Sequence, residues 1–345
     1  MKSYCNVPFI RFRIDFDGQY HSCCHQNGYY GNIFKEGKTI DELFKGQLLR
    51  EVKVATLNNE LHKICNNNQC PLYKTNLIKE YEVDPVAKYP KQIEMALSPR
   101  MCNIGGKNPT PNTACAMCPR SSKIWMQPYL DGTIPDRTDE VLEFIKPTFP
   151  TLETFTILGI IEPFYQNQIF NIFDKVEFKK YRDQIKVWTF CNATLFGEKV
   201  QERYYEYVKK SVFGFSVDAA TPETYKKIRR LDYFNVVKRN LTSYFKKCRE
   251  DDERWDESFI ANNINMWNVH EVSDMVRYAK EVGAPHIQFT PTHSEDQGYN
   301  LPKTQFCNKN NWQIFDEAQE KAIEVAKEIG QSIHFYVPLH RGFKK

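Results

Sequence analysis

The stretch Gln92-Ile-Glu-Met-Ala-Leu97, followed shortly by Met101-Cys-Asn-Ile-Gly-Gly-Lys-Asn-Pro-Thr-Pro-Asn-Thr-Ala-Cys-Ala-Met-Cys-Pro119, decides the fold. The first part has the pattern of a β-strand, and the second is a loop rich in Gly, Pro and Asn. This loop carries the thiols of Cys102, Cys115 and Cys118. Three thiolates on one loop can hold three irons of a cubane iron–sulfur cluster and leave the fourth iron open for a ligand.

A zinc ion is the alternative occupant of this loop. Structural zinc sites take four protein ligands, and the loop supplies no fourth Cys or His. We therefore favour an iron–sulfur cluster here and keep zinc as the alternative.

Length and composition indicate a folded protein. The chain has 345 residues, of which 41% are hydrophobic and 14% aromatic. This is enough to bury a large core, and it favours one large domain plus a smaller one. The formal net charge of +4 is too small to indicate nucleic-acid binding by itself.

The sequence pattern contains no candidate membrane segment. No apolar stretch approaches the roughly 18 residues of a membrane span, and the start Met1-Lys-Ser-Tyr-Cys5 is not an apolar signal segment. We therefore expect a cytoplasmic protein, not bound to a membrane, whose eleven cysteines serve mainly as metal ligands. The scattered Cys191, Cys248 and Cys307 are expected to be small buried hydrophobic residues.

The first 70 residues have the pattern of a separate small module. Residues 8–16 predict a strand, an Asp-Gly pair predicts a tight turn, and residues 19–24 predict a returning strand. This hairpin would bring Cys5 close to Cys23. Because side chains alternate across a strand, only one of Cys23 and Cys24 should reach a shared metal.

Two further thiols follow a predicted helix over residues 40–57, which has apolar residues at helical spacing. They lie in the short loop Cys65-Asn-Asn-Asn-Gln-Cys70. Together Cys5, Cys23, Cys65 and Cys70 would complete a second metal site. A structural zinc is the alternative to an iron–sulfur cluster there, since all four ligands would come from the protein.

Strands alternate with helices from about residue 93 onward, which predicts a parallel sheet. The predicted strands are 94–97, 154–158, 186–190, 212–217, 259–263, 286–290 and 332–337. The predicted helices include 198–210, 222–229, 234–249, 268–282 and 313–329. This pattern predicts an α/β fold: a partial or complete (β/α) barrel over residues 92–345, preceded by a small α+β module over residues 1–91. In such barrels the chemistry lies at the carboxyl ends of the strands.

Unusual polar residues follow three of the predicted strands. The second strand leads into Leu158-Gly-Ile-Ile-Glu162-Pro163, the third into Cys191-Asn192-Ala193, and the fourth into Ser216-Val-Asp218, with Arg229-Arg230 further on. An ordinary surface carboxylate is the alternative for Glu162, and a solvated helix end is the alternative for Arg229 and Arg230.

This ordered set resembles the radical S-adenosylmethionine (radical SAM) superfamily over roughly residues 92–295. The cluster loop, the Gly-Glu-Pro element, the Thr-Asn-Gly element and the Ser-x-Asp stretch with a following Arg all have counterparts here. Residues 4–71 resemble the SPASM or twitch module that binds an auxiliary iron–sulfur cluster, although that module usually follows the barrel.

The chain departs from the superfamily pattern at four points, one of which is Met117, where the family usually has an aromatic residue. Twelve residues separate Cys102 from Cys115, whereas the common first spacing is three residues. The Gly-Gly-Glu element is reduced to Gly159-Ile-Ile-Glu162, and the Thr-Asn-Gly element to Cys191-Asn192-Ala193.

The resemblance implies two 4Fe-4S clusters and bound SAM. The first cluster would be held by Cys102, Cys115 and Cys118, and the auxiliary one by Cys5, Cys23, Cys65 and Cys70. For SAM, Glu162 would bind the ammonium group and Arg229 the methionyl carboxylate. Asn192 and Ser216 would contact the ribose or the methionyl group, and Met117 would pack against the adenine. Asp218 is expected to order its loop. Weaker candidates for the adenosyl or substrate side are Asn263, Asn265, Gln288, Thr290 and His293.

The implied activity is reductive cleavage of SAM to a 5′-deoxyadenosyl radical, which abstracts hydrogen from an unreactive carbon. A ribosomally made peptide or a protein side chain is the expected substrate, with a sugar or nucleotide as the alternative, and no catalytic residue is assigned. The expected partner is an electron donor such as flavodoxin or ferredoxin. A non-catalytic metal-binding scaffold is the rival hypothesis, and it would need no polar residues at the strand ends. An RNA-modifying enzyme would need a basic groove that the net charge does not indicate.

Overall fold

The computed structural model describes residues 1–23, 26–65, 81–97, 115–118, 133, 135–158, 162–251, 255–292, 303–308 and 310–335. The chain forms two compact units. Unit 1 consists of Met1–Ser98, Pro135–Gly159 and Ile172–Trp188, and unit 2 of Pro99–Ile134, Ile160–Asn171 and Thr189–Lys345. The domain boundary that we expect at residue 91 stays a prediction.

Unit 1 is built on strands in the order β7-β6-β2-β3-β4. These strands are β2 (Arg11–Ile14), β3 (Gln19–His21), β4 (Gly31–Asn32), β6 (Gln92–Ala96) and β7 (Thr154–Leu158). Strand β6 pairs in parallel with both β2 and β7, whereas β3 pairs antiparallel with β2 and β4. A separate antiparallel pair joins β1 (Lys2–Ser3) to β5 (Tyr81–Glu82).

The helices of unit 1 are short. They are α1 (Val7–Ile10), α2 (Ile33–Glu36), α3 (Ile40–Phe44), α4 (Gln47–Leu57) and α7 (Thr138–Ile145), with 3-10 segments over Lys146–Thr151 and Phe178–Tyr181. Helix α8 (Gln168–Lys175) and strand β8 (Lys186–Cys191) each begin in one unit and end in the other.

The predicted hairpin is confirmed, but its first strand is shorter than expected. Strands β2 and β3 pair antiparallel, and Gly18 in the turn has a φ of +83°, which glycine adopts without strain. The prediction of a strand from residue 8 was wrong, because Val7–Ile10 forms helix α1. Pro8 lies in the first turn of this helix, where its fixed φ suits the helix and its missing N–H costs nothing.

The predicted helix over residues 40–57 is two helices, α3 and α4, and the expectation of one was wrong. Gly46 breaks it, with φ −55° and ψ 154°. The prediction rested on the helical spacing of Leu43, Phe44 and Leu48, which runs across the break. Leu43 and Phe44 of α3 are buried, and Leu48 of α4 is partly buried. Periodicity alone therefore could not reveal the break.

One face of the unit 1 sheet forms a hydrophobic core, and the other is charged. Phe12, Ile93 and Phe155 are buried on neighbouring strands. On the opposite face, Arg11 and Arg13 lie 3.2 Å and 3.8 Å from the carboxylate of Glu94. Period-two alternation along β2 and β6 separates the two faces.

Unit 2 contains parallel strands in the order β13-β12-β11-β9, with β10 paired to β9. The strands are β9 (Lys210–Ser216), β10 (Trp255–Asp256), β11 (Phe259–Ile264), β12 (His286–Pro291) and β13 (Ser332–Phe335). The helices are α9 (Glu198–Tyr205), α10 (Pro222–Arg229), α11 (Phe234–Glu250), α12 (Val272–Val282) and α13 (Trp312–Ile329). Short 3-10 segments span Tyr165–Asn167, Val269–Glu271 and Lys303–Gln305.

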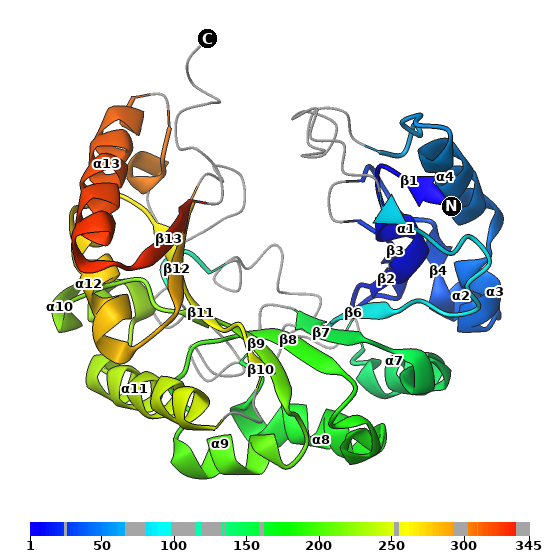
Figure 1. The fold of residues 1–345 in the computed structure, drawn as a ribbon, viewed down its shortest axis with the longest axis horizontal. Coiled ribbons are helices and arrows are strands. Elements are labelled where there is room, and N and C mark those ends of the chain that lie inside the picture. The colour runs from blue at the N-terminus through cyan, green and yellow to red at the C-terminus, as the bar shows by residue number, and fades with distance from the viewer. Residues whose placement is uncertain are drawn as a thin grey trace. The chain divides into compact units, whose positions relative to one another are not determined.

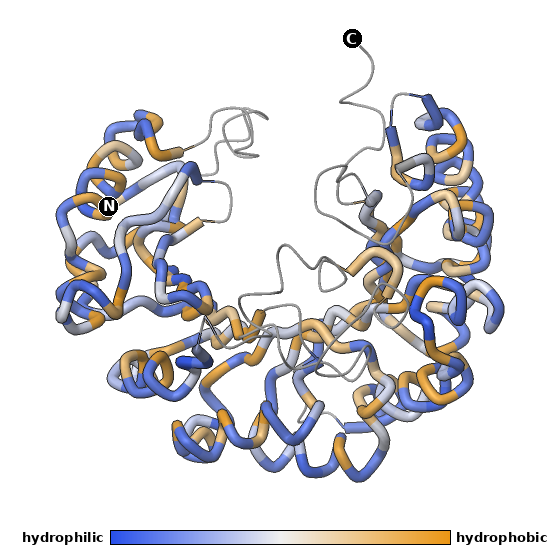
Figure 2. Tube along the Cα trace, turned by 180° about the vertical axis from the view of Figure 1, so that it is seen from behind, coloured by the Kyte–Doolittle hydropathy of each residue, from blue (hydrophilic) through white to orange (hydrophobic). Residues whose placement is uncertain are grey.

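In unit 2 the helices α10–α13 lie along one side of the strands (Figure 1). Hydrophobic and hydrophilic residues alternate every few positions along these helices (Figure 2), as expected for helices that pack on a sheet by one face. Between the helices and strand β9, Phe196 stacks on Phe164 at 4.6 Å and lies 5.0 Å from Phe213.

The predicted α/β class is confirmed. All seven predicted strands are present as β6, β7, β8, β9, β11, β12 and β13, and the predicted helices α10, α11 and α13 match within one residue at each end. The helix expected over residues 198–210 ends earlier, at Tyr205, because Lys210 already begins β9. Successive parallel strands joined by helices are the repeating units from which (β/α) barrels are built.

Among the residues that the structure describes, no helix has both the length and the apolar character needed to cross a membrane.

Candidate functional site

Glu162 is a buried carboxylate in unit 2, four positions after the end of β7. Its side chain has no solvent exposure. The backbone N–H of Asn192 donates to Oε2 at 2.7 Å, and the thiol of Cys191 donates to Oε1 at 3.3 Å. Burial raises the pKa of Glu162 to about 7, although these two donors and the charge of Arg229 oppose the rise. The alternative of a surface carboxylate is therefore wrong.

The turn after β8 holds these two donors in place. Ala193 has a φ of +59°, and its N–H donates to the Cys191 sulfur at 3.1 Å. The side-chain amide of Asn240 on α11 donates to the carbonyl of Ala193 at 2.8 Å. A left-handed residue directly after Asn192 thus turns the chain so that one N–H and one thiol face Glu162.

Arg229 forms an ion pair with Asp218. Both side chains are buried, Arg229 at the end of α10 and Asp218 in the loop after β9. Burial alone would lower the pKa of Arg229, but the carboxylate of Asp218 raises it above its ordinary value, so the guanidinium stays charged. A solvated helix end is therefore wrong for Arg229, whereas Arg230 is partly exposed with its guanidinium 5.9 Å from the ring of Trp267.

The loop that contains Asp218 is fixed from strand β11 and the segment after it. The N–H of Asn263 donates to Asp218 Oδ1 at 2.8 Å, and the side chain of Asn268 donates to the Asp218 carbonyl at 2.7 Å. Two residues on, the N–H of Ala220 donates to Glu271 at 2.7 Å. The expectation that Asp218 orders its loop is consistent with these contacts.

The segment with Cys115 and Cys118 lies against the end of α10. The N–H of Ala116 donates to the carbonyl of Ile228 at 2.8 Å. Arg229 Nη1 donates to Cys115 Sγ at 3.8 Å, so a cation faces this thiol. Burial raises the pKa of Cys115, and the charge of Arg229 opposes that rise. A neighbouring cation is typical of a thiol that acts as a thiolate ligand.

Tyr225 of α10 is within electrostatic reach of Cys115, Glu162, Asp218 and Arg229. Its ring is fully buried. Burial raises the pKa of its hydroxyl, and the charges of Cys115, Asp218 and Glu162 raise it further against the opposing charge of Arg229. One phenol is thus within electrostatic reach of groups from the cysteine loop, the loop after β7, the loop after β9 and α10.

The remaining predicted residues are less constrained. The Ser216 hydroxyl at the end of β9 is partly exposed and has no hydrogen-bond partner in the described part of the chain. Asn192 accepts at its side-chain oxygen from Thr194 N at 3.0 Å. Met117 is partly exposed between the two cysteines. Asn265 is buried, and its amide nitrogen has no partner among the described residues. Cys102, Gly159 and His293 lie outside the described residues.

In unit 1, three predicted ligands lie within electrostatic reach of Tyr30. Burial raises the pKa of Tyr30, and the charges of Cys65, Cys23 and Cys5 raise it further. A β-bridge between Gln26 and Cys65 brings the segment after Cys23 beside Cys65. Cys24 and Cys70 lie outside the described residues. Within the described residues, no three Cys, His, Asp or Glu side chains form a complete metal site.

Sequence reasoning missed the contact of Cys191. Its burial was predicted correctly, as was that of Cys307, but Cys248 is only partly buried and donates to Asp256 at 3.5 Å. Cys191 is also more than a hydrophobic residue, because its thiol binds Glu162. Its position beside Asn192 at a strand end was the one signal available.

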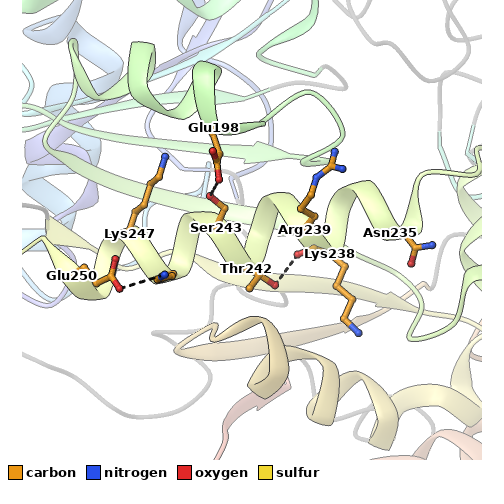
Figure 3. A pocket seen from close by; sticks show the side chains of 9 residues that line it. Glu198, Asn235, Lys238, Arg239, Thr242, Ser243, Lys247 and Glu250 are labelled. Carbon is orange, nitrogen blue, oxygen red and sulfur yellow. Dashed lines mark hydrogen bonds and ion pairs between the residues drawn. The ribbon is translucent and has the colours of Figure 1, made fainter.

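A surface pocket of about 540 Å³ lies elsewhere in unit 2, along α11 (Figure 3). Ser243 donates to Glu198 of α9 at 3.0 Å, and the other lining side chains are four Lys or Arg residues together with Asn235, Thr242 and Glu250. It contains none of the thiols or buried carboxylates described above, so it is not our candidate site.

No family model matches the sequence, and no curated protein matches it. Solved structures are similar in part. The structure of anSMEcpe with bound AdoMet and Cp18Cys peptide is 19% identical with a TM-score of 0.47, covering 71% of this chain and 62% of its own. The structure of Streptococcus suis SuiB bound to precursor peptide SuiA is 11% identical with a TM-score of 0.49. That match covers 99% of this chain and 74% of SuiB. The structure of TYW1 with a lysine-pyruvate adduct bound is 13% identical with a TM-score of 0.38. That match covers 66% of this chain and 70% of TYW1. The chain thus spans less than two thirds of the length of anSMEcpe.

Proposed function

We propose that this protein is a radical SAM enzyme. A 4Fe-4S cluster would supply the electron that cleaves bound SAM to a 5′-deoxyadenosyl radical, which takes a hydrogen atom from an unreactive carbon of the substrate. The observation that carries this proposal is that the buried Arg229 contacts both Asp218 and Cys115, with the buried carboxylate of Glu162 within electrostatic reach of it.

The donor set fits the groups that the proposal requires. Two thiols on one segment, one of them facing a cation, suit a cluster with an open iron. A buried carboxylate suits an ammonium group, because it then gains the opposite charge that it lacks. Arg229 Nε is buried without an acceptor among the described residues, which leaves one donor for a carboxylate.

The residues then take the following roles. Cys102, Cys115 and Cys118 hold the cluster, Glu162 binds the methionyl ammonium group, and Arg229 binds the methionyl carboxylate while its other end stays paired with Asp218. Ser216 and Asn192 contact the ribose or methionyl group, and Met117 contacts the adenine.

We further propose that Cys5, Cys23, Cys65 and Cys70 hold an auxiliary 4Fe-4S cluster in unit 1. The support is that three of these thiols act electrostatically on the phenol of Tyr30, and that a β-bridge brings the segment after Cys23 beside Cys65. Since protein would supply all four ligands, this cluster would transfer electrons or stabilise the unit and would not bind substrate. The proposed substrate is a ribosomally made peptide or a protein side chain, and the proposed electron donor is a flavodoxin or ferredoxin.

The test is SAM affinity and formation of 5′-deoxyadenosine by the anaerobically reconstituted, reduced protein. Glu162→Gln keeps the size of the side chain and removes its charge, and it should weaken SAM binding by roughly 1.5–3 kcal/mol while cluster content stays normal. Glu198→Gln, in the surface pocket on α11, is the matched control and should change nothing. Stoichiometric zinc without sulfide in both units, or unchanged SAM binding in Glu162→Gln, would contradict the proposal.

A further inference from the structure

The hydroxyl of Tyr225 is buried and has no hydrogen-bond partner in the part of the chain that the structure describes. Arg229, one helical turn further along α10, has the same deficit at Nε. Residues four apart on a helix lie on one face, so the two unused donors project from the same side of α10.

Such groups are exceptional, because nearly all buried polar atoms in folded proteins have a partner. A buried donor without an acceptor costs free energy, and no described residue compensates for that cost here. Phenylalanine would fill the same space without this cost. A hydroxyl at this position is therefore better explained by a ligand that accepts from it.

The surroundings define the chemistry of that ligand. A tyrosine hydroxyl is protonated at neutral pH, so that of Tyr225 is a hydrogen-bond donor and not a phenolate. Arg229 beside it carries a full positive charge. A neutral donor next to a cationic donor suits an anionic acceptor with at least two oxygens, and the carboxylate of SAM is such a group.

We propose that Tyr225 is a ligand-binding residue whose hydroxyl donates, together with Nε of Arg229, to the methionyl carboxylate of SAM. This inference rests on the proposed function and adds a residue to its binding site. In this arrangement two nitrogens of the guanidinium bind different groups: Nη2 pairs with Asp218, and Nε donates to the ligand.

The experiment compares the reconstituted wild type with Tyr225→Phe by equilibrium dialysis against three probes. SAM and S-adenosylhomocysteine carry the carboxylate, whereas 5′-methylthioadenosine lacks the whole amino-acid end. Loss of one hydrogen bond to a charged acceptor should weaken the first two by roughly tenfold or more and leave the third unchanged. The ligand-free variant should be as stable as the wild type or more stable, because the lost hydroxyl has no partner among the described residues.

Tyr204→Phe is the matched control. Tyr204 is equally buried, but its hydroxyl accepts from Ser211 at 3.3 Å. Its loss should lower the stability of the ligand-free protein and leave the affinity for SAM unchanged, which is the opposite pattern.

Three results would overturn the assignment. Equal SAM affinity in Tyr225→Phe and wild type removes Tyr225 from the site and leaves the proposed function standing. Equal weakening of all three probes shows a distorted pocket and not a carboxylate contact. Failure of the wild type to bind any probe removes the proposed function and this assignment together.

Discussion

Arg229 at the end of α10 and Asp218 in the loop after β9 form an ion pair with side-chain exposures of only 10% and 0%. Both charges are buried away from water, and for each side chain the opposite charge of its partner offsets the cost of desolvation. Arg229 also reaches Cys115 at 3.8 Å, so the pair connects the cysteine loop to the sheet of unit 2.

Removing one member of this pair should destabilise the fold strongly. Asp218→Ala leaves a buried unpaired cation and should cost about 3–5 kcal/mol in the free energy of unfolding. The double variant Asp218→Asn, Arg229→Gln, which removes both charges, should recover much of that loss. Urea denaturation measures both, and strictly additive effects would show that the two charges do not interact.

The exposed pair Lys226–Asp232 provides the control for this experiment. Its atoms are 3.4 Å apart, but both side chains are largely exposed. Lys226→Ala should therefore change stability by less than about 1 kcal/mol.

Glu162 should make stability depend on pH in a specific direction. Its pKa rises from 4.5 to about 7 on folding, so the folded state favours the protonated form. The stabilising contribution is complete below pH 4.5 and is lost as the pH rises through about 7. Glu162→Gln cannot ionise, so its stability relative to the wild type should increase between those values. Denaturation of both SAM-free proteins at about pH 5 and about pH 8 measures the difference; a constant difference would mean that Glu162 keeps an ordinary pKa.

Each of the two cysteine sets should bind about half of the iron. We expect about eight irons and eight sulfides per reconstituted chain, because two cysteine sets imply two four-iron clusters. Replacing Cys115 and Cys118 together should remove about half of the iron and abolish SAM cleavage. Cys307→Ala, at another buried cysteine, should retain all of it. Iron and sulfide analysis provides the test, and full iron content in the double variant would rule out these two ligands.

The auxiliary site should distinguish between adjacent cysteines. Strand alternation turns the side chains of Cys23 and Cys24 to opposite faces, so only one of them reaches the cluster. Cys23→Ala should lose the second cluster, and Cys24→Ala should keep it, as measured by iron content and electron paramagnetic resonance. The reverse result would show that Cys24 is the ligand.

Much of the fold could be predicted because its signals are local. Strand β7 and helix α10 begin and end where the apolar pattern, Pro222 and the residues around Arg229 place them. The failures arose where a single residue overrides the pattern. Pro8 starts a helix inside an alternating stretch, and Gly46 interrupts a continuous helical period.

The residues of the candidate site could be predicted more easily than their contacts. Glu162 and Arg229 stood out at element ends, but the partner of each comes from another segment. The donor to Glu162 is a backbone N–H 30 positions away, which no side-chain pattern reveals. Likewise, the unpaired hydroxyl of Tyr225 looks like ordinary helix packing until the buried charges around it are placed.

The contact between the cysteine loop and α10 also bears on the order in which the protein matures. Cys115 and Arg229 are 114 positions apart in the chain, so bringing them together closes a long loop and costs conformational entropy. Local strand and helix units form without that cost, which means that the scaffold should assemble first and the loop should dock last. Metal insertion would then act on an already folded chain, and iron-starved cells should accumulate a folded precursor that can be loaded afterwards.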